Sequence, residues 1–69
     1  MTRTPVASSQ LSSVGYDQDT RKLEIQFKNG SIYEYDDVPP ETHKELMSSR
    51  STGEYFNKNI KWNFVYRKL

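Results

Sequence analysis

The residues best suited to chemistry in this 69-residue chain are cations and aromatic rings, and most of them lie in its second half. Basic side chains hold backbone phosphates, and aromatic rings stack on splayed bases. The pattern therefore points to contact with a nucleic acid. The residues that would make this contact are five cations and three tyrosines: Arg50, Lys58, Lys61, Arg67, Lys68, Tyr33, Tyr35 and Tyr55.

Catalysis has weaker support in the residue types. An enzyme needs a nucleophile, an acid/base pair or a metal cluster. The sole histidine, His43, falls on the apolar stripe of a predicted helix, where packing is the better interpretation. Asp36 and Asp37 are adjacent, so on a strand they would point to opposite faces. The chain has no cysteine and no glycine-rich loop. We therefore expect a non-catalytic module that needs no metal and no cofactor.

The formal net charge of +1 conceals a strong division of charge along the chain. Residues 1–42 carry four basic and seven acidic side chains, a net charge of −3. Residues 43–69 carry six basic and two acidic side chains, a net charge of +4. A surface that binds phosphates is thus expected in the second half.

The composition limits how many aromatic rings can serve a binding surface. With 33% apolar residues in 69, the chain can build one small core and needs nearly all of them inside it. The competing interpretation is that the aromatic residues only pack and the charges only solubilise. No segment approaches the ~20 apolar residues of a membrane span, and the first residues lack the apolar run of a signal peptide. The expected location is the cytoplasm.

Alternating apolar and polar residues predict a small antiparallel meander, with strands near residues 11–17, 22–28 and 31–37. The first ten residues are rich in Thr and Ser. We expect a loosely ordered arm over 1–10, followed by a single domain over 11–69. The segment Val38-Pro39-Pro40 ends the sheet, because proline cannot donate to a β-ladder.

Two helical segments are predicted after the prolines. Residues 41–50 place His43, Leu46 and Met47 at helical spacing, which favours a helix on the sheet. Ser51 and Glu54 have the spacing of a capping box, so a second short helical turn is expected to begin at Ser51.

The closing segment alternates with a period of two, which predicts a fourth strand or an extended segment. Its expected core side is aromatic and aliphatic: Ile60, Trp62, Phe64 and Tyr66. Lys61 and Arg67 would then project together on the opposite side, as a basic stripe suited to phosphate contact.

The turn at Asn29-Gly30 leaves two registers open for the strand that follows. A two-residue loop turns Tyr33 and Tyr35 away from the apolar face, as an exposed pair on which bases could stack. A three-residue loop over 28–30, with the glycine left-handed, instead pairs Ile25 with Tyr33 and makes both tyrosines core residues with their hydroxyls at the rim.

The three-residue loop is favoured because of the acidic residues on the same strand. The two-residue loop would place Glu34 and Asp36 on the core side of a very small domain, where an unpaired carboxylate is costly. The favoured register also pairs Leu23 with Tyr35.

The order and spacing of several segments resemble the KTSC domain. They are Val6-Ala7-Ser8-Ser9, Val14-Gly15-Tyr16-Asp17, Leu23-Glu24-Ile25-Gln26-Phe27, Gly30, Tyr33-Glu34-Tyr35, Val38-Pro39, Leu46-Met47, Ser51-Thr52-Gly53-Glu54-Tyr55-Phe56-Asn57 and Ile60. The resemblance covers residues 6–69. The family is named for a small domain at the C-terminus of some lysyl-tRNA synthetases, and it also occurs as stand-alone bacterial and phage proteins.

The resemblance implies a role in RNA binding through the family's association with a synthetase, and it implies no aminoacylation activity. The family is marked by a Tyr-x-Tyr motif, here Tyr33-Glu34-Tyr35. The chain departs from the family pattern at Thr42-His43, at Ser49 and at Phe64, where a tyrosine is common.

We thus expect an α+β domain with a three-stranded antiparallel meander, one helix, a short second helical turn and a C-terminal strand or extended segment. The expected function is a small RNA-binding or tRNA-binding module. The alternative is a protein-interaction module that uses a sheet edge or an exposed aromatic patch.

Overall fold

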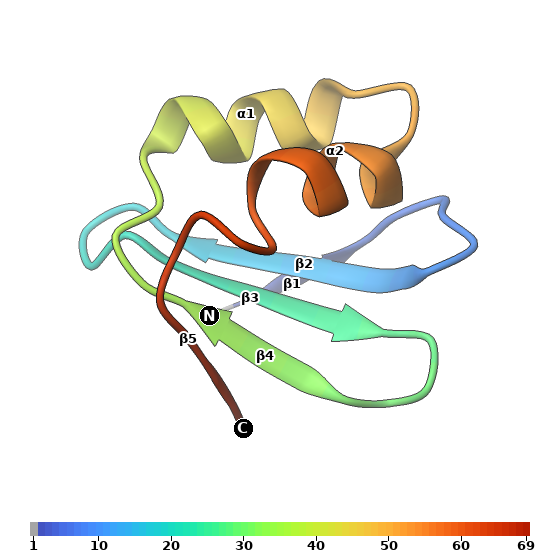
Figure 1. Cartoon of the computed structure of the whole chain (residues 1–69), viewed down its shortest axis with the longest axis horizontal. Coiled ribbons are helices and arrows are strands. Elements are labelled where there is room, and N and C mark those ends of the chain that lie inside the picture. The colour runs from blue at the N-terminus through green and yellow to red at the C-terminus, as the bar shows by residue number, and fades with distance from the viewer. Residues whose placement is uncertain (1) are drawn as a thin grey trace.

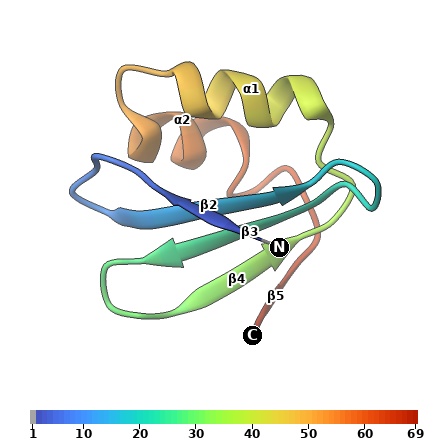
Figure 2. The same ribbon diagram turned by 180° about the vertical axis from the view of Figure 1, so that it is seen from behind.

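A computed structural model describes residues 2–69 as a five-stranded antiparallel sheet with both helices packed on one face (Figures 1 and 2). The strand order β1-β2-β3-β4-β5 follows the chain, and β5 joins the edge beside β4 after both helices. The α+β class is confirmed. The elements are β1 Arg3–Pro5, β2 Leu11–Asp17, β3 Lys22–Phe27, β4 Ile32–Tyr35, α1 Pro40–Ser48, α2 Thr52–Asn59 and β5 Tyr66–Lys68.

The core lies between the sheet and the helices. Alternate residues of the strands point into it, and each helix adds the residue on its inner face. The buried apolar side chains are Leu11, Val14, Leu23, Ile25, Tyr35, Val38, Leu46, Phe56 and Ile60. Within residues 2–69, no helix is both long enough and apolar enough to cross a membrane.

The hairpin between β3 and β4 has the three-residue loop, as predicted. Ile25 pairs with Tyr33 and Leu23 with Tyr35. The backbone N–H of Phe27 donates to the carbonyl of Ser31 at 2.8 Å, which closes the loop. Gly30 has φ +93°, a conformation that a side chain disfavours. Both tyrosines therefore lie on the side of the sheet that faces the helices.

The N-terminal segment forms a strand, whereas its composition suggested a loose arm. Residues 3–5 pair with β2, because backbone pairing requires no apolar side chain. Gln10 and Asn57 exchange side-chain hydrogen bonds of 3.0 and 3.3 Å, which tie the β1–β2 loop to α2. A Cβ at Gly53 would stand 3.1 Å from the hydroxyl of Ser8, so glycine permits this close approach. Residue 1 lies outside the described residues.

Both helices form near the predicted positions. The expected helix over 41–50 begins one residue earlier, at Pro40, and ends at Ser48. The expected helical turn at Ser51 is an eight-residue helix, and the Ser51 hydroxyl accepts the N–H of Glu54 at 3.3 Å.

The closing segment was predicted wrongly over residues 60–65. Ile60 is buried as expected, but β5 covers only Tyr66–Lys68. The chain turns directly after α2, since the backbone N–H of Lys61 donates to Phe56 at 2.9 Å. Trp62 is therefore 76% exposed and Tyr66 is 47% exposed. The alternation of apolar and polar residues thus corresponds to a strand only at residues 66–68.

Candidate functional site

A cleft of about 260 Å³ opens on the helix side of the sheet, beside β4 and β5. Five of its lining residues are aromatic, and we call it the aromatic cleft. The lining residues are Phe27, Asn29, Ser31, Tyr33, Tyr35, Lys61, Trp62 and Tyr66.

Strand register brings three tyrosines together in the aromatic cleft. Tyr33 and Tyr35 share one face of β4, and Tyr66 of β5 stands opposite Tyr35. The ring centroids lie 5.7 Å apart for Tyr33 and Tyr66, and 5.5 Å apart for Tyr35 and Tyr66. Lys68 pairs with Tyr33, and directly paired residues share a face. Lys68 thus belongs to the cleft side of the sheet.

The floor of the cleft is fixed by packing against the core. The ring of Tyr35 meets the buried ring of Phe56 edge-on at 5.5 Å, and Phe27 meets the same ring at 5.6 Å. Tyr35 is only 3% exposed. Burial, with Tyr66 and Tyr33 nearby, raises the pKa of Tyr35 to about 12, so its hydroxyl keeps its proton.

The mouth of the cleft is formed by the turn after α2. Trp62 is the most exposed of the large apolar side chains described, and the Lys61 ammonium lies 5.0 Å from the centroid of its ring. This is a cation–π distance. No carboxylate from residues 2–69 lines the cleft, so the charge of Lys61 meets no acidic partner there.

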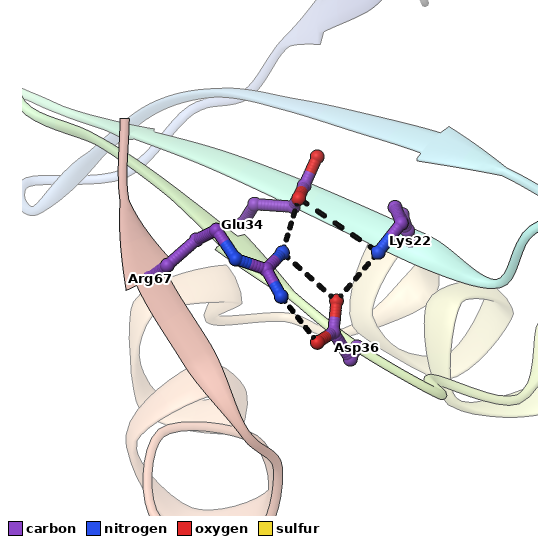
Figure 3. Close-up of polar contacts among 4 residues, drawn as sticks. All are labelled: Lys22, Glu34, Asp36 and Arg67. Carbon is purple, nitrogen blue, oxygen red and sulfur yellow. Dashed lines mark hydrogen bonds and ion pairs between the residues drawn. The ribbon is translucent and has the colours of Figure 1, made fainter.

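The opposite face of the sheet carries an ion cluster (Figure 3). Lys22 lies 2.8 Å from the Asp36 carboxylate, and Arg67 contacts both Asp36, at 2.7 Å, and Glu34. Hydrogen bonds from Arg67 and Lys22 lower the pKa of Asp36 to about 2. Two cations thus face two carboxylates, and the charge of Arg67 is compensated within the protein.

A third location holds three of the predicted residues. Arg50, Tyr55 and Lys58 line a hollow of about 340 Å³ at the start of α2. The Tyr55 hydroxyl donates to the carboxylate of Glu45 at 2.7 Å, and Lys58 pairs with Glu54 at 2.8 Å. Burial and the Glu45 carboxylate raise the pKa of Tyr55 to about 12. Tyr55 and Lys58 are therefore already bound to carboxylates of the protein itself.

The eight residues predicted from the sequence thus lie in three places. The aromatic cleft and its border bring together four of them: Tyr33, Tyr35, Lys61 and Lys68. Arg67 lies on the far face, and the expected stripe of Lys61 with Arg67 does not form.

The sequence reasoning assigned no binding role to several cleft residues, above all Trp62 and Tyr66. The alternation of the closing segment favours the core side for both of them. One feature of the sequence could have indicated their exposure: residues 57–59 are polar, which allows the helix capped by Ser51 to continue for two turns. A helix of that length leaves too few residues for a long closing strand, so Trp62 falls in a turn.

The histidine packs as the sequence suggested. The His43 ring stacks on Tyr16, with centroids 4.5 Å apart, and burial lowers its pKa. The Tyr16 hydroxyl donates to the backbone carbonyl of Val38 at 2.5 Å. In the part of the chain that the structure describes, no three His, Cys, Asp or Glu side chains lie close enough to hold a metal ion.

Fold and cleft together define a small α+β domain that keeps one face of its sheet for the core and leaves an aromatic cleft beside the last strand. The family model of the KTSC domain matches residues 7–64, and the chain belongs to this family.

The relatives include both short proteins and one class of large enzyme. An uncharacterised protein of Stutzerimonas stutzeri is 41% identical over 88% of this chain and 86% of its own length. A lysine–tRNA ligase of Nostoc punctiforme is also 41% identical over 88% of this chain, which corresponds to 11% of that ligase. A solved KTSC domain protein from Yersinia pestis is 46% identical, with a TM-score of 0.93, over 99% of this chain and 96% of that one.

Proposed function

We propose that this protein is a non-catalytic module that binds single-stranded RNA through the aromatic cleft. The observation that carries the proposal is the combination of five aromatic rings with Lys61 in one cleft, and Lys68 beside it. Unstacked bases bind to aromatic rings, and ammonium groups bind the phosphates on either side. The exposed rings of Trp62 and Tyr66 are available for stacking without loss of core packing.

The relatives support an RNA partner. Domains similar to this chain form part of lysine–tRNA ligases in Nostoc punctiforme and Trichormus variabilis, which are enzymes named for tRNA. A binding module in such an enzyme would increase its affinity for RNA without taking part in the reaction. The cytoplasmic location expected from the sequence belongs to the same proposal.

The absence of catalysis is part of this proposal too. The His43 ring is stacked on Tyr16, and burial lowers its pKa. Asp36 and Glu34 are held by Arg67 in the ion cluster. The histidine and these two carboxylates lie apart from the aromatic cleft, so they do not meet a ligand bound there.

The set of cations that we propose to contact RNA is smaller than the set predicted from the sequence. Arg67 is compensated on the far face, and Lys58 is paired with Glu54. Lys61 and Lys68 are then the cations next to the cleft, which suits contact with about two phosphates. For a single strand, two phosphates give a slope of log affinity against log salt of about −1.4. We therefore expect weak but salt-dependent binding.

The test is a titration of a labelled single-stranded RNA and of tRNA at two salt concentrations. The Lys61→Glu/Lys68→Glu double variant should lose at least about tenfold in affinity, because repulsion replaces two phosphate contacts. Trp62→Ala should lose about tenfold or more, because it removes a stacking surface. Lys44→Glu, the same charge reversal at one exposed position of α1, is the control and should bind normally. No salt-dependent binding at high micromolar protein would contradict the proposal.

A protein-interaction module is the second candidate, and one observation favours it. Among residues 2–69, the large exposed apolar side chains all lie in the closing segment: Trp62, Val65, Tyr66 and Leu69. They flank the open edge of β5, where an extended chain could add a strand. Reversing the charges of Lys61 and Lys68 separates the candidates, because it should weaken RNA binding at least about tenfold but spare a contact made by backbone and apolar groups.

A further inference from the structure

We infer that the aromatic cleft seats one unstacked nucleobase and that its polar wall favours uracil and guanine, which carry a carbonyl oxygen where cytosine and adenine carry an amino group. This inference rests on the proposed RNA-binding function. It goes beyond it, because stacking on aromatic rings alone tolerates any base.

The shape of the cleft favours a single planar ligand. Its volume of about 260 Å³ is bounded by rings that are fixed by the core, with Tyr35 and Phe27 packed edge-on against Phe56. Trp62 and Tyr66 form the exposed side. Such a site takes up a base that has left its stack, and the strand on either side remains outside.

The charge of the cleft argues against the other common ligand of aromatic clusters. Rings arranged in this way also bind quaternary ammonium groups. Here, however, Lys61 lines the cleft, Lys68 borders it, and no carboxylate among residues 2–69 joins the lining. A cation would be repelled, whereas a base that carries its own phosphate would be attracted.

Three tyrosine hydroxyls are available to a ligand. The tyrosine hydroxyls that bond within residues 2–69 are those of Tyr16 and Tyr55. Those of Tyr33, Tyr35 and Tyr66 bond to none of these residues. No fully buried polar side-chain atom in the described chain lacks a partner, so the hydroxyl of the buried Tyr35 reaches the open space of the cleft. Since its pKa is raised, it remains a donor.

Two further groups of the polar wall act only as donors, whereas the hydroxyls of Ser31 and the tyrosines can also accept. The amide oxygen of Asn29 accepts the backbone N–H of Ser31 at 2.9 Å, which turns its oxygen into the hairpin loop and leaves its NH₂ group for the cleft. The Lys61 ammonium can only donate. The two fixed donors, Asn29 and Lys61, suit O4 of uracil and O6 of guanine. They suit the amino groups at the same positions of cytosine and adenine poorly, because two donors then face each other.

The experiment uses the one tryptophan of the chain as its probe, because Trp62 is part of the cleft. The protein is titrated with the four nucleoside monophosphates, and with short oligouridine and oligocytidine, while Trp62 fluorescence is followed. We expect quenching by every bound nucleotide, and at least about fivefold tighter binding of UMP than of CMP. Equal affinities, or tighter binding of CMP and AMP, would overturn the inference.

The matched variant is Asn29→Asp. It keeps the oxygen that accepts the Ser31 N–H but replaces the NH₂ donor by a second acceptor. General repulsion by the new charge lowers both affinities alike, so the ratio of UMP to CMP binding is the readout. We expect this ratio to fall several-fold, and an unchanged ratio would contradict the assignment of Asn29. If oligouridine and oligocytidine bind equally, only the inference fails; if no oligonucleotide binds, the proposed function fails with it.

Discussion

The cations on the two faces of the sheet differ in whether a carboxylate pairs with them. On the outer face, Arg67 and Lys22 are held by Glu34 and Asp36, so their charge is compensated. On the face with the cleft, Lys61 is set among aromatic rings without an acidic neighbour. The number of cations in a segment therefore says little about phosphate binding. Phosphate binding depends on which face of the sheet each cation occupies, and successive residues of β5 point to opposite faces.

The largest expected effect comes from the ring that supports the cleft from below. Phe56 is fully buried and contacts both Phe27 and Tyr35. Phe56→Ala should lower the free energy of unfolding by about 3–5 kcal/mol, because a large cavity opens in a small core. Denaturant unfolding followed by circular dichroism measures the loss. A loss below about 1 kcal/mol would show that the cleft floor does not depend on this ring.

The sharpest test of the comparison uses two neighbouring residues of β5. Lys68→Gln and Arg67→Gln remove the same charge from opposite faces of the sheet. We expect Lys68→Gln to weaken RNA binding about threefold or more at low salt, and to leave the unfolding midpoint unchanged. Arg67→Gln should instead lower the unfolding midpoint and leave RNA affinity as it is. If both variants weakened RNA binding equally, the two faces would not differ as described.

The hairpin loop tests the register on which the comparison depends. Gly30 has φ +93°, and nothing lies within 4 Å of where a Cβ would stand. Gly30→Ala should therefore cost about 1 kcal/mol in unfolding free energy through backbone strain alone. Gly30→Asn is the control and should cost less, since asparagine tolerates this conformation. Equal stability of Gly30→Ala and the parent chain would refute the left-handed loop.

The smallest expected effect is a pH dependence confined to the outer face. The pKa of Asp36 is about 2 in the folded protein, below its ordinary value of 3.8. Its contribution to stability is thus fully present above about pH 4 and is lost as the pH falls towards 2. In Asp36→Asn, stability should decline less steeply over this range, as thermal unfolding at several pH values will show. Parallel curves for the two proteins would contradict this role of Asp36.

The parts of the fold that could be predicted from the sequence are those in which nearby residues allow only one stable arrangement. The register of β4 could be predicted because Glu34 and Asp36 cannot face so small a core. The start of α2 could be predicted because Ser51 and Glu54 form a recognisable cap. In both cases a side chain within a few residues decided the outcome.

The candidate site was less predictable, because its members meet only through long-range pairing. Trp62 alternates with Phe64 and Tyr66 in the sequence, yet the extra turn of α2 moves it out of the strand. Lys68 and Arg67 seem equivalent until β5 is paired with β4. The β1 strand was missed for a related reason, since a three-residue strand held by backbone bonds leaves almost no pattern of side chains.

The short strand β5 links the two faces mechanically. One side of it contributes Tyr66 to the cleft, and the other side is fastened by Arg67 to the ion cluster. Edge strands of this length open readily, and their amide hydrogens exchange quickly with solvent. A nucleotide in the cleft would hold the strand closed, so the amides of Arg67 and Leu69, which face β4, should exchange more slowly in the complex. Exchange at these two amides would therefore report whether the cleft is occupied.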